Sequence, residues 1–141
     1  MEYIFREKLI RPGLVVQNVY PKVVLVTDPD ETMARIYARH FDLVEYITQI
    51  CTQYKELLKK LTELEPHLLL FTLPAEQKHS IEMVKKITRN SPTLKIVTLS
   101  EQSGEDALMK ELLQLGISGH INKALTRPRD VIQLAHNVLN Y

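Results

Sequence analysis

The chain has 141 residues, a formal net charge of +1 and a single cysteine, Cys51. This length is enough for one domain with one core, and the near-neutral charge excludes a broad electrostatic attraction for nucleic acid. One cysteine excludes an internal disulfide and a multi-cysteine metal site, so we expect Cys51 to be a buried apolar residue in a reducing compartment.

The sequence also argues against membrane insertion and secretion. No apolar stretch approaches the ~18 residues that a membrane-spanning helix needs. The first eight residues include acidic side chains and no long apolar run, unlike a signal peptide. We therefore expect a cytoplasmic protein with no membrane contact.

Residues 1–21 are predicted to be an N-terminal extension of a main domain that covers residues 22–141. Within the extension, Arg11-Pro12-Gly13 is a turn signal that separates two apolar stretches, residues 3–5 and 14–16. These stretches could pair as a hairpin or lie over the domain. They are too apolar to be left in water, and we expect them to pack on their own domain rather than on a partner.

From residue 22 onward, strand patterns alternate with helix patterns. The apolar runs typical of buried strands are residues 23–26, 44–51, 68–71, 94–99 and 117–122. The amphipathic stripes typical of helices lie within residues 33–41, 54–61, 81–87, 108–115 and 131–138. Gly116 is expected to end the fourth helix, and Thr126 to cap the start of the last one.

This alternation predicts the fold class. Short connections between strands and helices impose parallel pairing and right-handed crossovers. We predict an α/β protein of the (βα)5 type, a doubly wound parallel five-stranded sheet with helices on both faces. The pattern does not fix the strand order, but 2-1-3-4-5 is common at this size.

Four polar residues directly follow or close predicted strands: Asp28, Thr72, Ser100 and Lys123. The carboxyl ends of parallel strands share one edge of the sheet, where sites are built in open α/β folds. We therefore expect these four side chains to cluster. An acid, two hydroxyls and a lysine are typical of a phosphoryl-transfer site, but threonine is the wrong residue at the position of the nucleophile.

Three segments resemble the receiver domain of two-component response regulators. Residues 66–72 resemble its Pro-Asp-Leu-(apolar)3-Asp run, and residues 80–84 its Gly-Leu-Glu-Leu-Leu run. Residues 115–123 resemble the Gly-Ala-x-Gly-Tyr-(apolar)2-Lys motif, the most specific of the three. The resemblance extends from residue 22 to about residue 140 and implies a flavodoxin-like, three-layer α/β/α fold.

The resemblance also implies roles for the strand-end residues. Receivers hold Mg²⁺ with two adjacent acids, accept a phosphoryl group on an aspartate after the third strand, and bind that group with a hydroxyl and a lysine. The first acid matches Asp28, and the acceptor position is held by Thr72. The two phosphate contacts match Ser100 and Lys123, and His120 occupies the position of the switch aromatic residue.

The substitutions predict a degenerate pseudo-receiver that cannot accept phosphate. A threonine hydroxyl is a weak nucleophile without a base. Pro29 replaces the second acid, with Asp30 one residue later, whereas Mg²⁺ prefers near-octahedral oxygen ligands. No cofactor is therefore expected, although Asp28 and Asp30 form an acidic pocket in which Asp28 could hold Mg²⁺. Asp28 could equally cap the first helix, and we expect Lys123 to pair with it as a modest ion pair.

The predicted function is a non-enzymatic interaction or regulatory module of a two-component pathway. The sequence contains no glycine-rich phosphate loop or Ser-His-Asp set. The alternative is an active receiver with a displaced phosphate site that uses Asp30 for the metal. The expected partners are signalling proteins or a second copy, bound through residues 105–141, whose exposed side chains are expected to mix both charges without a large apolar patch. A pH-sensing role for His120 is less favoured than a core or surface role.

Overall fold

The computed structural model describes residues 21–101 and 106–140. Its five strands form one parallel sheet in the order β2-β1-β3-β4-β5, which confirms the predicted doubly wound sheet and the order 2-1-3-4-5. The strands are β1 (Val23–Thr27), β2 (Ile47–Cys51), β3 (Leu68–Thr72), β4 (Lys95–Ser100) and β5 (Gly119–Asn122).

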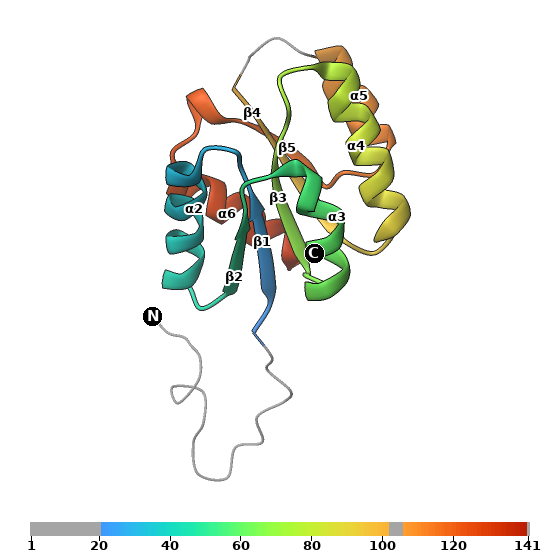
Figure 1. Ribbon diagram of the computed structural model, residues 1–141. Helices are drawn as coiled ribbons and strands as arrows, with labels where there is room; N and C mark the ends of the chain where they lie inside the picture. Colours follow the sequence, from blue (N-terminus) through green and yellow to red (C-terminus); the bar gives the residue numbers. More distant parts are fainter. Residues whose placement is uncertain (1–20, 102–105, 141) are drawn as a thin grey trace, which may run out of the picture.

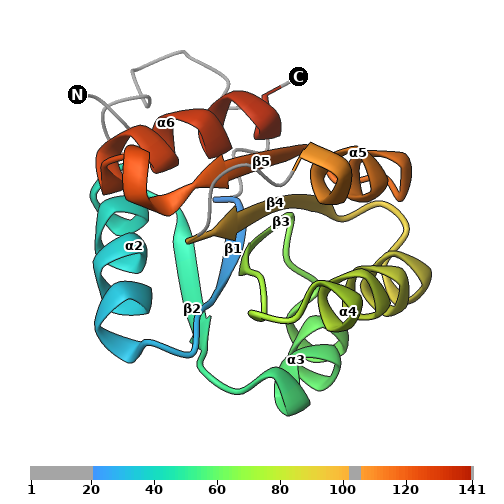
Figure 2. The ribbon, with the colours of Figure 1, turned by 90° about the horizontal axis from the view of Figure 1, so that it is seen from above.

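Helices cover both faces of this sheet, as Figures 1 and 2 show. α2 and α6 lie on one face, and α3, α4 and α5 lie on the other. The helices are α2 (Glu31–Leu43), α3 (Leu57–Leu64), α4 (Gln77–Asn90), α5 (Asp106–Gln114) and α6 (Pro128–Leu139), with short 3₁₀ turns η1 (Tyr54–Glu56) and η2 (Lys123–Leu125). The predicted three-layer, flavodoxin-like architecture is therefore confirmed.

The sheet divides the buried apolar residues into two clusters, because successive strand side chains point to opposite faces. Val24 and Val26 join the cluster under α2 and α6, whereas Leu25 joins the one under α3, α4 and α5. All five residues of β3 are buried, as expected for a central strand covered on both sides. Cys51 is 1% exposed, so its predicted burial is confirmed.

The start of β2 differs from the prediction. The strand begins at Ile47 rather than at residue 44. Glu45 has a φ of 68°, in the left-handed region, and the amide of Tyr46 bonds back to the carbonyl of Phe41 at 3.1 Å. Residues 44–46 therefore form the turn that ends α2, although their composition is that of a strand.

Of two predicted helix boundaries, one is confirmed and the other is wrong. Gly116 follows α5 with a φ of 106°, a conformation that favours glycine, so its predicted role at the end of that helix is confirmed. The prediction for Thr126 is wrong, because α6 begins at Pro128 and its N-cap residue is Arg127, with no side-chain cap. Proline at the first helical position needs no amide partner and has its φ preset.

The predicted packing of residues 3–5 and 14–16 lies outside the described residues. Within the described ranges, no helix is both long and apolar enough to span a bilayer.

Candidate functional site

Asp28 is the centre of a buried polar group at the carboxyl edge of the sheet. Its Oδ2 accepts hydrogen bonds from Lys123 Nζ at 2.7 Å and from Thr72 Oγ1 at 3.0 Å. Its Oδ1 accepts a third from the backbone amide of Asp30 at 2.9 Å. Asp28 is 1% exposed and Thr72 is 4% exposed. Three donors therefore satisfy a carboxylate that burial would otherwise penalise.

Three strand ends bring these side chains together. Asp28 directly follows β1, Thr72 is the last residue of β3, and Lys123 directly follows β5. The amide of Asp28 donates to the carbonyl of Cys51 at 3.1 Å, which fixes the turn after β1 against β2. The contacts agree with the clustering that the strand ends predict, while the roles of these residues in signalling stay predictions.

The ion pair between Lys123 and Asp28 was expected and is present, but its environment differs from the expected one. The two side chains are only 9% and 2% exposed, so this is not a surface ion pair of small worth. Breaking a buried pair by removing one partner leaves an uncompensated charge and costs several kcal/mol. Lys123 therefore supplies the positive charge that compensates the buried carboxylate of Asp28.

Asp30 and Asp28 have different local tasks. The side chain of Asp30 accepts from the amides of Thr32 at 3.0 Å and Met33 at 3.3 Å, which makes it the N-cap of α2. The alternative in which Asp28 caps this helix is therefore wrong. Asp30 is exposed and contributes its backbone amide, not its carboxylate, to Asp28.

A cavity of about 370 Å³ adjoins this group at Thr72. Ser100, which is 7% exposed, lines it together with Thr72 and Pro29. Tyr54 also lines it and donates its hydroxyl to the carbonyl of Thr72 at 2.6 Å. Burial, and then the negative charges of Asp28 and Glu101, raise the pKa of Tyr54. The phenol therefore stays a neutral donor across the physiological range.

Tyr54 is a site residue that sequence reasoning missed. The sequence places it only in an apolar helical stripe, with no sign that its hydroxyl meets the end of β3. Its ring contacts Phe71 edge-on at a centroid distance of 5.8 Å. This packing directs the hydroxyl to the carbonyl of Thr72, and only the folded path of the β2–α3 connection reveals it.

His120, at the expected switch position in β5, is half-buried. Its Nδ1 lies 2.6 Å from the hydroxyl of Thr98, a buried residue in the middle of β4. Thr98 is a second partner that the sequence did not single out, because it carries no distinguishing motif. The contact ties the side chain of His120 to the sheet.

The hydrogen-bond donors that surround Asp28 do not suit a Mg²⁺ site. Mg²⁺ takes oxygen ligands in near-octahedral geometry, commonly from carboxylates. The resemblance implies Asp28 as a metal ligand. Its carboxylate already accepts hydrogen bonds from the ammonium of Lys123, the hydroxyl of Thr72 and the amide of Asp30. In the described part of the chain, no cluster of three or more His, Cys, Asp and Glu side chains could hold a metal ion.

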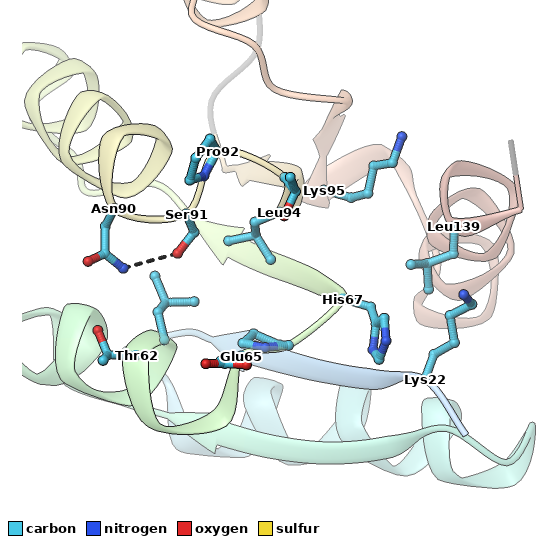
Figure 3. A pocket seen from close by; sticks show the side chains of 13 residues that line it. Lys22, Thr62, Glu65, His67, Asn90, Ser91, Pro92, Leu94, Lys95 and Leu139 are labelled. Carbon is cyan, nitrogen blue, oxygen red and sulfur yellow. Dashed lines mark hydrogen bonds between the residues drawn. The ribbon is translucent and has the colours of Figure 1, made fainter. Parts of the chain in front are cut away.

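A second cavity, of about 570 Å³, lies at the opposite edge of the sheet (Figure 3). It is lined by residues at the amino ends of three strands, among them Lys22, His67 and Lys95. Nδ1 of His67 accepts a hydrogen bond from the amide of Val23 at 3.0 Å. This ring therefore completes the backbone bonding at the start of β1 and takes no part in the Asp28 group.

Three leucines are exposed on the described part of the predicted partner face, residues 105–141. Leu113, Leu125 and Leu134 are 48%, 80% and 46% exposed. A groove of about 420 Å³ runs between β5 and α6, lined by Leu134, His120 and Val138 among others. The predicted mixture of charges is also present, since Lys110, Glu111 and Arg129 are exposed.

The fold agrees with the family comparison. The model of the response regulator receiver domain matches residues 24–135, and the chain belongs to this family. It is therefore a receiver domain of the kind found in two-component response regulators.

Individual relatives are distant. The transcriptional regulatory protein LnrK of Bacillus subtilis (strain 168) is 28% identical over 105 residues, which cover 73% of this chain and 47% of that protein. The chain thus spans about half the length of this curated relative.

Solved structures show the same fold. A CheY-like response regulator receiver domain protein from Methanospirillum hungatei JF-1 has a TM-score of 0.76 at 20% identity, with 86% of this chain and 95% of that chain covered. A response regulator from Thermotoga maritima has a TM-score of 0.78 at 16% identity, with coverages of 86% and 100%.

Proposed function

We propose that this chain is a pseudo-receiver, a receiver domain that regulates a signalling partner without accepting a phosphoryl group and without catalysis of its own. The observation that carries the proposal is the Asp28 group. The acceptor position holds Thr72, whose hydroxyl donates to Asp28, and the lysine expected to bind phosphate is paired with the same carboxylate.

The chemistry of the position supports this view. Attack on a phosphodonor needs an activated nucleophile. The Thr72 hydroxyl donates its hydrogen bond to the Asp28 carboxylate, and Lys123 donates to the same carboxylate oxygen. A phosphate ester on threonine would also lack the easy hydrolysis of an acyl phosphate.

The alternative is an active receiver with a displaced phosphate and metal site at Asp30. The cap that Asp30 makes on α2 opposes it, because metal binding would compete with two helix amides for the same carboxylate. No observation favours this alternative over the pseudo-receiver.

The experiment is incubation with acetyl phosphate and Mg²⁺, followed by intact-mass spectrometry. We expect no phosphoryl adduct on the wild-type chain. The control variant Pro29→Asp with Thr72→Asp restores both carboxylates on the same scaffold and should acquire an adduct at position 72. An adduct on Asp28, Asp30 or Thr72 of the wild type would overturn the proposal.

Two further points belong to the same proposal. Residues 1–21 are an extension of the receiver-like domain at 22–141, supported by a family match that begins at residue 24. The site of action is the cytoplasm, supported by a single buried cysteine. Cell fractionation of a tagged chain tests the second point, and recovery with membranes or outside the cell would contradict it.

A further inference from the structure

A groove of about 330 Å³ lies between α3 and α4, which run side by side in Figures 1 and 2. We call it the α3–α4 groove. Its floor reaches the buried layer under the two helices, because it is lined by Leu57 and Ile87, which are 0% and 1% exposed. Leu58, which is 37% exposed, and the half-buried Met83 also line it. The two helices thus leave apolar side chains open to a binding partner.

The basic side chains along the α3–α4 groove are not matched by acids. Lys55, just before α3, and Lys86, on α4, line the groove, and His79 adds a ring N–H donor. Among the described residues, no carboxylate lines it; the nearby Glu56 and Glu82 are exposed and lie outside the lining. Within residues 21–101 and 106–140, neither Lys55 nor Lys86 forms an ion pair. Both ammonium groups are therefore available to a partner.

The spacing of the lining residues suits a helical ligand. His79, Met83 and Lys86 follow one another at i, i+4 and i+7, so they share one stripe of α4. Leu58 lines the same groove from α3. A helix that lies in an apolar groove places its own apolar stripe on the floor and its polar side chains at the rims. Methionine adapts to the shape of such a stripe.

The charge of the rims selects an acidic helix among the possible occupants. A second copy of the chain has a net charge of +1 and brings no excess of acid. Nucleic acid would be attracted by the lysines, but its phosphates would gain nothing from the apolar floor. A volume near the lower end of the range of about 300–1,000 Å³ for ligand pockets suits a few side chains rather than a large cofactor. Carboxylates on either side of an apolar stripe match both the rims and the floor.

We propose that the α3–α4 groove binds an acidic amphipathic helix of a signalling partner. Carboxylates of that helix pair with Lys55 and Lys86, and its apolar side chains cover Leu58 and Met83. The inference goes beyond the proposed function, because it assigns a binding surface, lined by none of residues 105–141, and the chemistry of its partner.

Tyr54 connects this surface with the carboxyl edge of the sheet. It lines both the α3–α4 groove and the cavity at Thr72, and its hydroxyl donates to the carbonyl of Thr72 at 2.6 Å. A helix bound in the groove therefore adjoins a residue that contacts the Asp28 group. The inference does not depend on phosphate acceptance, which intact-mass spectrometry tests separately.

Titration of the ¹⁵N-labelled 141-residue chain with a synthetic peptide, followed by NMR, tests the proposal. The probe is a helical peptide of about 18 residues, with leucines at i, i+4 and i+7 and glutamates on either side of them, added up to about 1 mM. We expect saturable shifts at the amides of Leu58, Met83 and Lys86. The same peptide with lysine in place of each glutamate should shift none of them.

Two double variants locate the charges that matter. Lys55→Glu with Lys86→Glu should weaken binding of the glutamate peptide at least about tenfold, because like charges then meet. Lys59→Glu with Lys85→Glu is the matched control, since it changes the net charge equally at exposed positions outside the lining. In about 0.15 M salt, where exposed charges are screened beyond about 8 Å, it should weaken binding less than about threefold. Met83→Gln should also weaken binding, because it makes the floor polar.

Several results would overturn the proposal. These are the absence of saturable shifts at the groove amides, equal binding of the lysine peptide, and equal losses from the two double variants. A short DNA duplex that shifts the same amides with similar affinity would show a general polyanion surface and would overturn the choice of a protein helix. Shifts at these amides on concentrating the chain alone would assign the α3–α4 groove to a second copy and would overturn it as well.

Discussion

Asp28 combines deep burial with hydrogen bonds from three donors at the carboxyl edge of the sheet. Its ammonium partner comes from a residue 95 positions away, and its hydroxyl partner from one 44 positions away. A contact between such distant positions forms only when β1, β3 and β5 are aligned. The group therefore reports on the integrity of the whole sheet.

Removing Lys123 should show how much its ion pair with Asp28 contributes to the stability of the fold. Lys123→Met leaves Asp28 buried without its counter-charge, and we expect a loss of about 3–5 kcal/mol in the free energy of unfolding. Urea denaturation measures it. Adding Asp28→Asn to the same chain should recover part of the loss, because the amide carries no charge.

The matched control is the exposed ion pair between Arg35 and Glu31, whose side chains are 68% and 59% exposed. Arg35→Met should cost less than about 1 kcal/mol. Equal losses from the two single substitutions would contradict the assigned role of burial.

Tyr37 gives a second prediction at this scale, on pH dependence. Burial, then the charges of Asp28 and Glu101, raise its pKa to about 12. In the unfolded chain a tyrosine ionises near pH 10, so between about pH 10 and 12 the unfolded state releases the proton first. Stability should fall as pH rises through this window.

Tyr37→Phe should make that alkaline fall shallower than in the wild type, as measured by urea denaturation at a series of pH values. Tyr46 and Tyr54 also have raised pKa values and account for a remaining slope. An unchanged slope in the variant would contradict the assignment to Tyr37.

At the scale of elements, two helix ends place a residue in the left-handed region of backbone conformation. Glycine suits this conformation at one end, whereas glutamate is strained by it at the other. Gly116 follows α5 with a φ of 106°, and Glu65 ends α3 with a φ of 46°. A non-glycine residue pays roughly 1–2 kcal/mol for this conformation. A Cβ at Gly116 would meet no atom within 4 Å, so backbone strain alone decides the effect there.

We therefore expect Gly116→Ala to lower the free energy of unfolding by about 1 kcal/mol, and Glu65→Gly to raise it by up to about 1 kcal/mol. Thermal or urea unfolding of the two variants checks the signs. A stabilising Gly116→Ala would show that the turn after α5 adopts another backbone conformation in solution.

The elements also show which parts of the fold and of the site can be predicted from the sequence. The apolar run at residues 68–71 predicts β3 nearly to the residue, because a strand buried on both faces has no polar interruption. Residues 44–46 look like part of a strand, but the left-handed Glu45 turns them away. The meeting of Asp28, Thr72 and Lys123 follows from strand ends alone, whereas the partners Tyr54 and Thr98 depend on loop path and strand register, which no local pattern encodes.

At the scale of the whole molecule, we predict that copies of the chain associate through the groove between β5 and α6. Its apolar lining and flanking charges suit an interface of modest area. We expect concentration-dependent, weak self-association in sedimentation velocity, and Leu134→Glu should abolish it.

Leu58→Glu is the matched control, because Leu58 is 37% exposed on α3, on the opposite face of the sheet. This variant should associate as the wild type does. A wild-type chain that stays monomeric at every concentration would remove residues 105–141 as a self-association face and leave them to other partners.

The buried pairing of Lys123 with Asp28 has an energetic consequence for signalling if the phosphate-independent proposal holds. A receiver that changes state by covalent modification draws on the energy of its phosphodonor. With its lysine already engaged, this domain has only binding energy to draw on. Moving a two-state equilibrium from 1:99 to 99:1 requires about 10⁴-fold tighter binding to one state, or about 5.5 kcal/mol. Its output would then follow the concentration of its partner. It would reverse as soon as that partner dissociates, because no phosphoryl group would have to be removed.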